Sequence, residues 1–445
     1  MWARWKKIEC ILPGLVVAGL IVATSGCASG PKDDISYLDW MVEAAPERAE
    51  LPELSDESTV EDLERYAVLN NPGVQAAYHD WQAARYRPSQ EEALPDPMLM
   101  LSYDDIMAQT AVGLSQRFPW FGVRKLRAEA ATEAARKAEQ RLIAAQLEVS
   151  AEVRRAYAEH YYLAQSVVVT RENRRLVEQL EAVARARFRA GEGAYREVVR
   201  AQVELGQLDD RLRELADLTG ASAARLNAAM GRPTDGPVPE PTAVPAPTIE
   251  PDAAQLLVWL VESNPELAEL EHEVDRRQTL VDLAGKQYYP ELNVGADYVV
   301  ASDMSRGSTP IMASVGVALP VWRGKYDAAV RESRQAVRSV LQARQDRVNR
   351  LGARLRMALY EFRDAERKDE LYRETLIPKA RESLDTALAD YAAGRASFND
   401  VVDATRIYLE FELSHRRALA DRVIGHAELE ALIGRPLPGE DREDD

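Results

Sequence analysis

The apolar and polar positions of residues 124–190 form the longest regular pattern in the chain. This stretch contains no Gly or Pro and is rich in Ala, Glu, Arg and Leu, which are strong helix formers. Positions that would face a neighbouring helix recur at alternating steps of four and three residues, and this is the spacing of coiled-coil packing. The positions of this seam are Leu142, Gln146, Val149, Val153, Ala156, His160, Leu163 and Val167. At about 1.5 Å per residue, roughly 67 residues predict a helix about 100 Å long, which no compact globular domain needs.

Shorter elements precede this helix. Residues 59–87 have a helical pattern that is interrupted at Asn71-Pro72, and Thr59 and Asp62 are spaced as a capping pair at its start. Short segments with strand character follow, and a second pair of them occurs farther along the chain. The strand-like segments are residues 98–103, 111–118, 292–300 and 311–319. The pattern therefore predicts helix, two strands and long helix, in that order.

Glycine and proline mark where the long helices end. Gly191 and Gly394 predict tight turns, after which return helices run to about Met230 and Ile433. The second long helix contains Pro378, which must bend or interrupt it. Each long helix is thus expected to fold back on itself as a helical hairpin.

The chain also repeats itself at a long period. Six motifs recur in the same order, with offsets that drift from 193 to 203 residues. The pairs are Asn71-Pro72 with Asn264-Pro265, Leu94-Pro95 with Tyr289-Pro290, Phe118-Pro119 with Leu319-Pro320, Ala190-Gly191 with Ala393-Gly394, Val198-Val199 with Val401-Val402, and Gly231-Arg232-Pro233 with Gly434-Arg435-Pro436. Six ordered matches indicate an internal duplication, and such a period can decide the whole fold.

The N-terminus has the features of a bacterial export signal. A basic stretch is followed by an apolar run at residues 11–23, which is shorter than the ~20 residues that a spanning helix needs. The tripeptide Thr24-Ser25-Gly26 before Cys27 resembles a lipobox, although Thr24 stands where Leu is usual. We expect Cys27 to be the lipid attachment site; ordinary secretion with a free thiol is the alternative.

These features divide the chain into six segments. The expected segments are a lipoprotein signal peptide (1–26), an N-terminal linker (27–58), a first repeat (59–233), a Pro-rich connector (234–251), a second repeat (252–436) and an acidic tail (437–445). The connector is proline-rich and should be stiff and extended.

Charge and composition exclude several classes of function. The chain has 56 Lys+Arg against 73 Asp+Glu, so its net charge of -17 argues against nucleic acid as a partner. Two cysteines leave no disulfide framework or cysteine-rich metal site. No phosphate-binding glycine loop, HExxH pair or GxSxG elbow occurs. We therefore expect no enzyme activity, no cofactor and no metal site.

Four strands cannot close a barrel in one chain, and an open sheet facing lipid would leave its edge groups unpaired. Partner copies must complete it. Two copies would give eight strands with a filled interior, whereas three would give twelve strands and room for a lumen. The expected fold class is mainly α with a small β contribution: a long coiled-coil helical tunnel, and four strands per chain that partner copies complete into a barrel.

Across about residues 59–436, the chain resembles the outer membrane factor (TolC-like) family, lipoprotein subgroup. The motifs that carry the resemblance are NNPGVQAA and SNPELAEL, LPDP and YPEL, QRFPWFG and ALPVWRG, and the closing GRP of each half. The resemblance implies a homotrimer whose four strands per chain complete a trimeric twelve-stranded outer-membrane barrel. It further implies that the protein is lipid-anchored in the outer membrane of a Gram-negative bacterium and has a periplasmic tunnel. It also implies docking with a periplasmic adaptor protein and an inner-membrane transporter.

The resemblance also assigns roles at the hairpin tips. Asp400 and Asp403 match an acidic ring at the periplasmic gate, where six carboxylates in a trimer would raise one another's pKa. Glu197 and Tyr391 match a helix-pair latch, whose basic member is expected at Ala396, with Arg395 beside it. The tip glycines, Gly191 and Gly394, would contact the adaptor. A solvated acidic helix surface is the alternative for the two aspartates.

The resemblance implies an exit channel of a tripartite efflux pump, and some motifs are similar to members associated with heavy-metal or cation efflux. Type I secretion or drug efflux is the alternative cargo assignment. A non-channel periplasmic coiled-coil tether or adaptor is an alternative of another class, and the duplicated strand pairs argue against it.

Overall fold

The structure is a computed structural model that describes residues 54–55, 58–104, 109–239, 241, 244, 246–301 and 311–438, all of which belong to one structural unit. The expected signal peptide and Cys27 lie outside the described residues.

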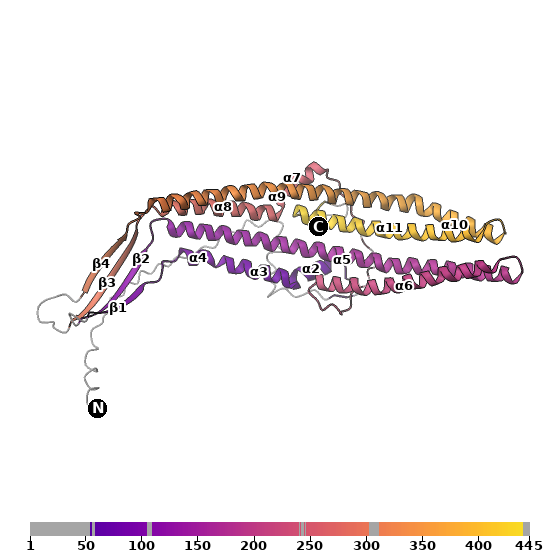
Figure 1. The fold of residues 1–445 in the computed structure, drawn as a ribbon, viewed down its shortest axis with the longest axis horizontal. Helices are drawn as coiled ribbons and strands as arrows, with labels where there is room; N and C mark the ends of the chain where they lie inside the picture. Colours follow the sequence, from indigo (N-terminus) through magenta and orange to yellow (C-terminus); the bar gives the residue numbers. More distant parts are fainter. Residues whose placement is uncertain are drawn as a thin grey trace, which may run out of the picture. The chain divides into compact units, whose positions relative to one another are not determined.

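Two halves of the chain have the same order of elements, as the sequence repeat predicts (Figure 1). The first half contains α2 (Val60–Asn70), α3 (Pro72–Arg85), α4 (Arg87–Glu92), β1 (Met98–Asp104), β2 (Gln109–Phe118), α5 (Val123–Arg189) and α6 (Tyr195–Ala229). The second contains α7 (Ala253–Ser263), α8 (Pro265–Lys286), β3 (Glu291–Ala301), β4 (Ile311–Ala318), α9 (Arg323–Leu371), the π-helix η1 (Tyr372–Leu376), α10 (Ile377–Ala392) and α11 (Phe398–Ile433). The fold is mainly helical, as expected.

The predicted capping pair starts the first helix. The Thr59 side chain accepts from the Asp62 backbone N–H, and the Asp62 carboxylate accepts from the Thr59 backbone N–H over 2.9 Å. This reciprocal pairing satisfies two backbone donors that a helix start otherwise leaves unpaired.

The repeated Asn-Pro motif joins the start of each half to its end. The Asn71 side-chain amide donates to the Ala229 carbonyl over 2.9 Å, and the Asn264 amide donates to the Leu432 carbonyl over 2.8 Å. In both asparagines the side-chain oxygen also caps the following helix. One side chain therefore satisfies a helix start and a helix end together.

The closing Gly-Arg-Pro motif completes the same contact. Gly434 has a φ of 86°, and a Cβ at this position would lie 2.4 Å from the Ser263 carbonyl oxygen and 2.9 Å from the Pro265 ring. Only glycine fits this backbone conformation and this close approach.

The long helix α5 organises the helical core, because it packs against α6, α8 and α11. Its predicted seam faces inward, with Leu142, Val153 and Ala156 all nearly inaccessible. Each half also has a cluster at its helix starts and ends, and the members correspond through the repeat. The first cluster includes Leu63, Ala67, Leu226 and Met230, and the second includes Leu256, Leu260, Leu429 and Ile433. The duplicated apolar pattern thus builds two equivalent cores.

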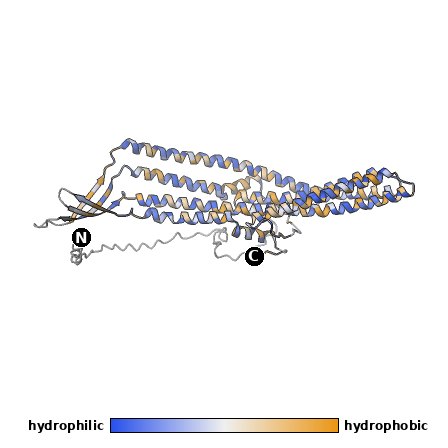
Figure 2. Cartoon of the chain, turned by 60° about the horizontal axis from the view of Figure 1, so that its bottom comes forward, coloured by the Kyte–Doolittle hydropathy of each residue, from blue (hydrophilic) through white to orange (hydrophobic). Residues whose placement is uncertain are grey.

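Apolar and hydrophilic residues alternate along the long helices, as Figure 2 shows. Among the described helices, none has the length and apolar character required to cross a membrane.

The four strands form one antiparallel sheet in the order β1-β2-β3-β4. Met98 is opposite Ser115, Leu114 is opposite Ala296, and Val294 is opposite Val315. Successive side chains of a strand point to opposite faces, and all eight residues of β4 are exposed, so neither face of this strand is covered by the described chain. Within the described chain, β1 and β4 each pair on one side only. The single chain therefore leaves two open edges and an exposed apolar surface.

The two long helices differ in one respect. α5 is continuous over 67 residues, whereas the second long helix is interrupted by η1 immediately before Ile377 and Pro378. Pro378 lacks a backbone N–H, and its ring crowds the carbonyl of Glu374, so a regular α-helix cannot be maintained there. The predicted interruption at Pro378 is confirmed as a π-helical turn.

Candidate functional site

Two helical hairpins place their turns at the same end of the helices (Figure 1). Gly191 and Gly394 have φ values of 77° and 75°, in the left-handed region that glycine adopts without strain. The turns close with equivalent hydrogen bonds, from Glu192 N–H to the Arg187 carbonyl over 2.9 Å and from Arg395 N–H to the Asp390 carbonyl over 2.8 Å. The two halves therefore end in the same turn.

An apolar cluster holds the two hairpins together near their turns. Its members come from α5, α6, α10 and α11, so it is shared by both halves of the chain. They are Leu180, Ala184, Val198, Ala201, Leu384, Tyr391, Phe398, Val401, Val402 and Ala404. This tip cluster fixes the position of the polar groups around it.

Tyr391 and Glu197, both predicted for the latch, are in contact. The Tyr391 hydroxyl donates to Glu197 Oε2 over 2.9 Å, and the tyrosine is only 2% exposed. Burial, together with the hydrogen bond to the Glu197 carboxylate, raises the pKa of Tyr391 to about 12. The hydroxyl is therefore a permanent donor at physiological pH.

Arg187 is the basic group beside this pair. Its guanidinium lies 4.6 Å from the centre of the Tyr391 ring and donates to the Tyr391 carbonyl oxygen. Sequence reasoning missed this residue because it lies on α5, in the other half of the chain. The only signal was its place in the last turn of a long helix, where a basic residue is also explained by the helix dipole.

Arg395 does not join the latch within the chain. Its guanidinium pairs with Asp390 at 2.7 Å, five residues earlier in the same turn, and its side chain is 68% exposed. The expected set of three is therefore brought together only in part: Glu197 and Tyr391 meet, and Arg187 supplies the cation.

Asp400 and Asp403 are both exposed in the single chain. Asp400 forms a capping box with Ser397, accepting from the Ser397 backbone N–H and hydroxyl, each over 2.8 Å. These hydrogen bonds lower the pKa of Asp400, whereas the expected repulsion within a ring would raise it. Within one chain, Asp400 is thus first a helix-capping residue, and Asp403 has no such role.

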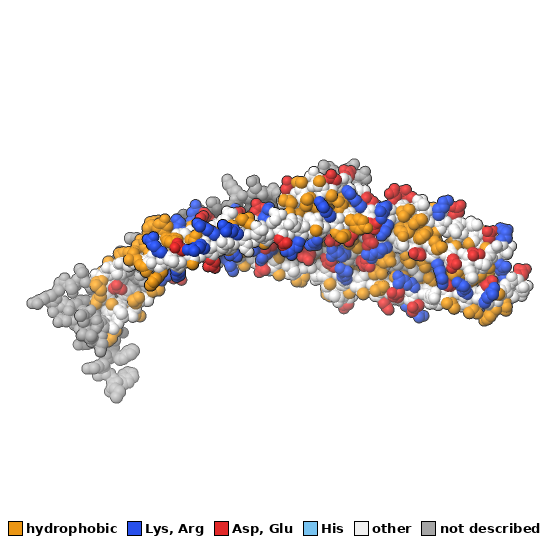
Figure 3. All heavy atoms as spheres, turned by 45° about the horizontal axis from the view of Figure 1, so that its top comes forward, with side chains coloured by type: hydrophobic (Ala, Val, Ile, Leu, Met, Phe, Trp, Pro, Cys, Tyr) orange, Lys and Arg blue, Asp and Glu red, His pale blue; other side chains and the backbone are white. Residues whose placement is uncertain are grey.

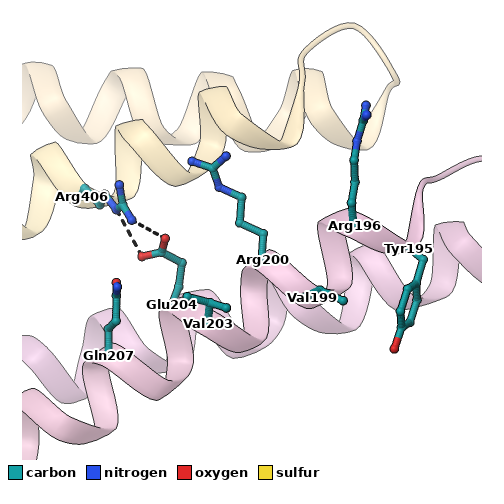
Figure 4. A pocket seen from close by; sticks show the side chains of 8 residues that line it. All are labelled: Tyr195, Arg196, Val199, Arg200, Val203, Glu204, Gln207 and Arg406. Atoms are coloured by element: carbon teal, nitrogen blue, oxygen red, sulfur yellow. Dashed lines mark hydrogen bonds and ion pairs between the residues drawn. The ribbon is translucent and has the colours of Figure 1, made fainter.

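A second bridge links the hairpins farther from the turns. Arg406 of α11 donates through both Nε, at 3.2 Å, and a terminal nitrogen to Glu204 of α6, as Figure 4 shows. Glu204 is only 8% exposed, so this forked ion pair is more protected than a surface pair. Exposed Val199 and Val203 lie beside it on α6, lining a shallow groove.

The seam residue His160 is buried, and its Nδ1 lies 2.7 Å from the Ser222 hydroxyl, which joins α5 to α6.

Aromatic residues lie where the strands meet the helices. Trp120 stacks on Tyr289 at 5.1 Å between ring centres, at the junction between strands and helices. Figure 3 shows apolar side chains gathered at this end of the molecule. Trp322 of the second half is 74% exposed there, as suits an interfacial aromatic residue.

The duplicated helical hairpins and the one open antiparallel sheet place the chain in the class of two-repeat, mainly helical proteins with a small sheet. The sequence model of the outer membrane efflux protein family matches residues 65–232 and 256–435, one segment in each half, and the chain belongs to this family. Its function is therefore that of an outer-membrane efflux channel.

Individual relatives extend over nearly the whole chain. The cobalt-zinc-cadmium resistance protein CzcC of Cupriavidus metallidurans is 22% identical over 385 residues, which cover 85% of this chain and 90% of that protein. The solved outer-membrane channel OprN matches with a TM-score of 0.74 at 17% identity, covering 85% of this chain and 90% of its own. The solved transmembrane channel CusC matches with a TM-score of 0.74 at 17% identity, covering 84% and 92%. These two likenesses show the shared fold.

Proposed function

We propose that three copies of this chain form the outer-membrane exit duct of a tripartite pump that expels divalent heavy-metal cations. The observation that carries the cargo assignment is the similarity, over 85% of this chain, to a cobalt-zinc-cadmium resistance protein. Drug efflux and type I secretion are the competing cargo assignments.

The sheet supports the trimer. Each chain contributes four strands, and β1 and β4 are left with unpaired edges in the described chain. Exposed edges and apolar faces are costly unless partner strands and lipid cover them. Three chains supply twelve strands, enough for a closed barrel with a lumen.

The helical hairpins support docking of the other pump components. The turns at Gly191 and Gly394 lie at the end of the helices opposite the strands, where a periplasmic adaptor protein and, through it, an inner-membrane transporter would join (Figure 1). Cys27, which precedes the described residues, would carry the lipid that anchors the chain to outer membrane lipid. In this role the chain is a conduit and performs no chemistry.

The gate is proposed at the hairpin tips. Asp400 and Asp403 would form the acidic ring, and the Tyr391–Glu197 hydrogen bond, with Arg187 beside it, would hold the hairpins in their resting positions. A ring of carboxylates at a constriction attracts cations, which fits the proposed cargo.

The test compares a deletion strain with the same strain carrying the gene. We expect the deletion to increase susceptibility to zinc, cobalt and cadmium, with little change for detergents and antibiotics. Increased susceptibility to drugs alone would assign the duct to drug efflux. Heat-modifiable trimers in the outer-membrane fraction are expected, whereas a soluble periplasmic monomer would support the tether alternative.

A further inference from the structure

The seam between α5 and α8 contains a group of metal-ligating side chains that no sequence motif revealed. Glu133 lies on α5, in the first half of the chain, and His272 and Asp275 lie one turn apart on α8, in the second half. The two helices pack against each other along this seam. The group therefore bridges the two halves, far from the hairpin tips.

The geometry brings three possible ligand atoms together. His272 Nδ1 lies 2.9 Å from Glu133 Oε2, and one carboxylate oxygen of Asp275 lies within 4.8 Å of both. The Glu133 and His272 side chains are 16% and 25% exposed, while Asp275 is exposed. Atoms bound to one zinc-sized ion through bonds of about 2.1 Å lie about 3.0–3.4 Å apart. The 2.9 Å between the Glu133 and His272 atoms is close to that spacing, and the Asp275 side chain, being exposed, can adjust to it.

Some carboxylates along the seam between α5 and α8 have a cationic partner, and Asp275 has none among the described residues. Lys137 pairs with Glu273 at 3.2 Å and Arg141 pairs with Glu269 at 2.9 Å, so carboxylates elsewhere on the seam face a cation. Asp275 has no hydrogen bond or ion pair from its carboxylate to any residue that the structure describes. Its position leaves a carboxylate beside a histidine without a positive partner.

One carboxylate oxygen of Glu133 is placed to bind a metal ion. Its Oε1 accepts from Arg136 over 2.8 Å, while Oε2 faces His272. The arginine thereby holds the carboxylate in place, as an outer partner does for a metal ligand.

We propose that Glu133, His272 and Asp275 form a binding site for one divalent transition-metal cation of the zinc and cobalt class. One imidazole nitrogen and two carboxylate oxygens suit such ions, with water completing the coordination. His272 would bind through Nδ1 as neutral imidazole with its hydrogen on Nε2, and an imidazolium would release one proton on binding. The site goes beyond the proposed function, because it would hold a metal whether or not metals are the cargo.

The experiment measures metal bound to the purified full-length protein. Co²⁺ is titrated and its visible absorption recorded, and Zn²⁺ binding is followed by calorimetry. We expect one saturable equivalent per chain. Binding should weaken at least ~100-fold in His272→Ala, which removes one ligand, and on the order of 10-fold in Asp275→Asn, which removes the negative charge of another.

Two controls make the result decisive. His79 is an exposed histidine on α3, remote from this group in the sequence, and His79→Ala should leave the affinity unchanged. Asp275 is exposed, so its substitution should not impair folding, which circular dichroism checks. Absence of saturable binding to the wild type, or equal binding by the wild type and both site variants, would overturn the proposal. Because the readout is bound metal, a failure of the cargo assignment in cells leaves it unaffected.

Discussion

The Tyr391 hydroxyl donates to Glu197 across 2.9 Å and so joins the end of α10 to the first turn of α6. Tyr391→Phe removes the hydroxyl and keeps the packed ring. In the proposed gate this hydrogen bond stabilises the closed channel. A hydrogen bond to a charged group contributes about 1.5 kcal/mol or more, so we expect the ratio of open to closed channels to rise about tenfold when the bond is lost. Single-channel recording in planar bilayers measures this ratio.

Arg395→Ala is the matched control for that variant. Arg395 is exposed, and among the described residues its guanidinium pairs with Asp390 of its own turn alone; exposed pairs contribute little. An equal increase of channel opening in Arg395→Ala would show that the tip responds to any loss of charge or hydrogen bonding.

The proposed acidic ring makes a separate prediction. Replacing Asp400 and Asp403 together with Ala should raise the single-channel conductance and weaken block by multivalent cations. Asp403→Asn alone should weaken the block without loss of stability, because Asp403 has no capping role, whereas Asp400→Asn also weakens the start of α11. Asp210→Asn, an exposed aspartate on α6, is the control. Unchanged block by multivalent cations in Asp403→Asn and in the double variant would contradict the hypothesis that these aspartates form a ring at the gate.

His415 predicts a pH dependence of the second half. Its Nε2 lies 3.0 Å from Asp369, which also binds Arg422 at 3.1 Å. Burial and the neighbouring Arg416 lower the pKa of His415, and they outweigh the opposing effects of Asp369 and Glu412. The unfolded chain therefore binds the proton more readily than the folded chain.

The sign of the effect follows from linkage. The stability contribution of neutral His415 is complete above the unfolded pKa of about 6.5 and is lost as pH falls through the lowered folded pKa. The protection of the α9 and α11 amides near His415, measured relative to the intrinsic exchange rate at each pH, should decrease as pH falls from about 7.5 to about 5.5 in the wild type. His415→Gln should flatten this dependence. A wild-type profile that does not change with pH would contradict it.

Gly434 and Gly191 form a matched pair for stability. Gly191→Ala places a side chain in open space and costs only the left-handed strain, about 1–2 kcal/mol. Gly434→Ala adds a Cβ 2.4 Å from the Ser263 carbonyl oxygen, so it must also displace backbone. We expect a clearly larger fall in the thermal unfolding temperature of the protein for Gly434→Ala. Equal falls in this temperature for the two variants would mean that the backbone around Gly434 and Ser263 rearranges with no loss of stability.

The order of elements could be predicted from sequence because it depends on local periodicity. The capping pair at Thr59, the strand positions and the interruption at Pro378 all involve residues close together in the chain. The repeat added more, since it marked Asn-Pro and Gly-Arg-Pro as important in both halves.

The pairing of those motifs could not be predicted, because it joins residues far apart in sequence. Nothing in the pattern shows that the Asn264 amide would reach the Leu432 carbonyl. The same reason hid Arg187 beside Tyr391 and the buried network of His415, Asp369 and Arg422. Charged residues on helices usually face solvent, so their burial requires knowledge of which helices are neighbours.

The π-helical turn at Tyr372–Leu376 makes the two hairpins mechanically unequal. α5 connects β2 to its tip through one uninterrupted ladder of hydrogen bonds, so a load applied at Gly191 is carried toward the sheet. On the other hairpin, a force applied at Gly394 passes through α10 to the π-helical turn, where Pro378 has no backbone N–H to donate. Only beyond this turn does it reach α9. The second hairpin can therefore bend near its tip while β4 keeps its pairing with β3. Each chain thus contributes one stiff hairpin, which contains α5, and one hairpin with a flexible point at η1.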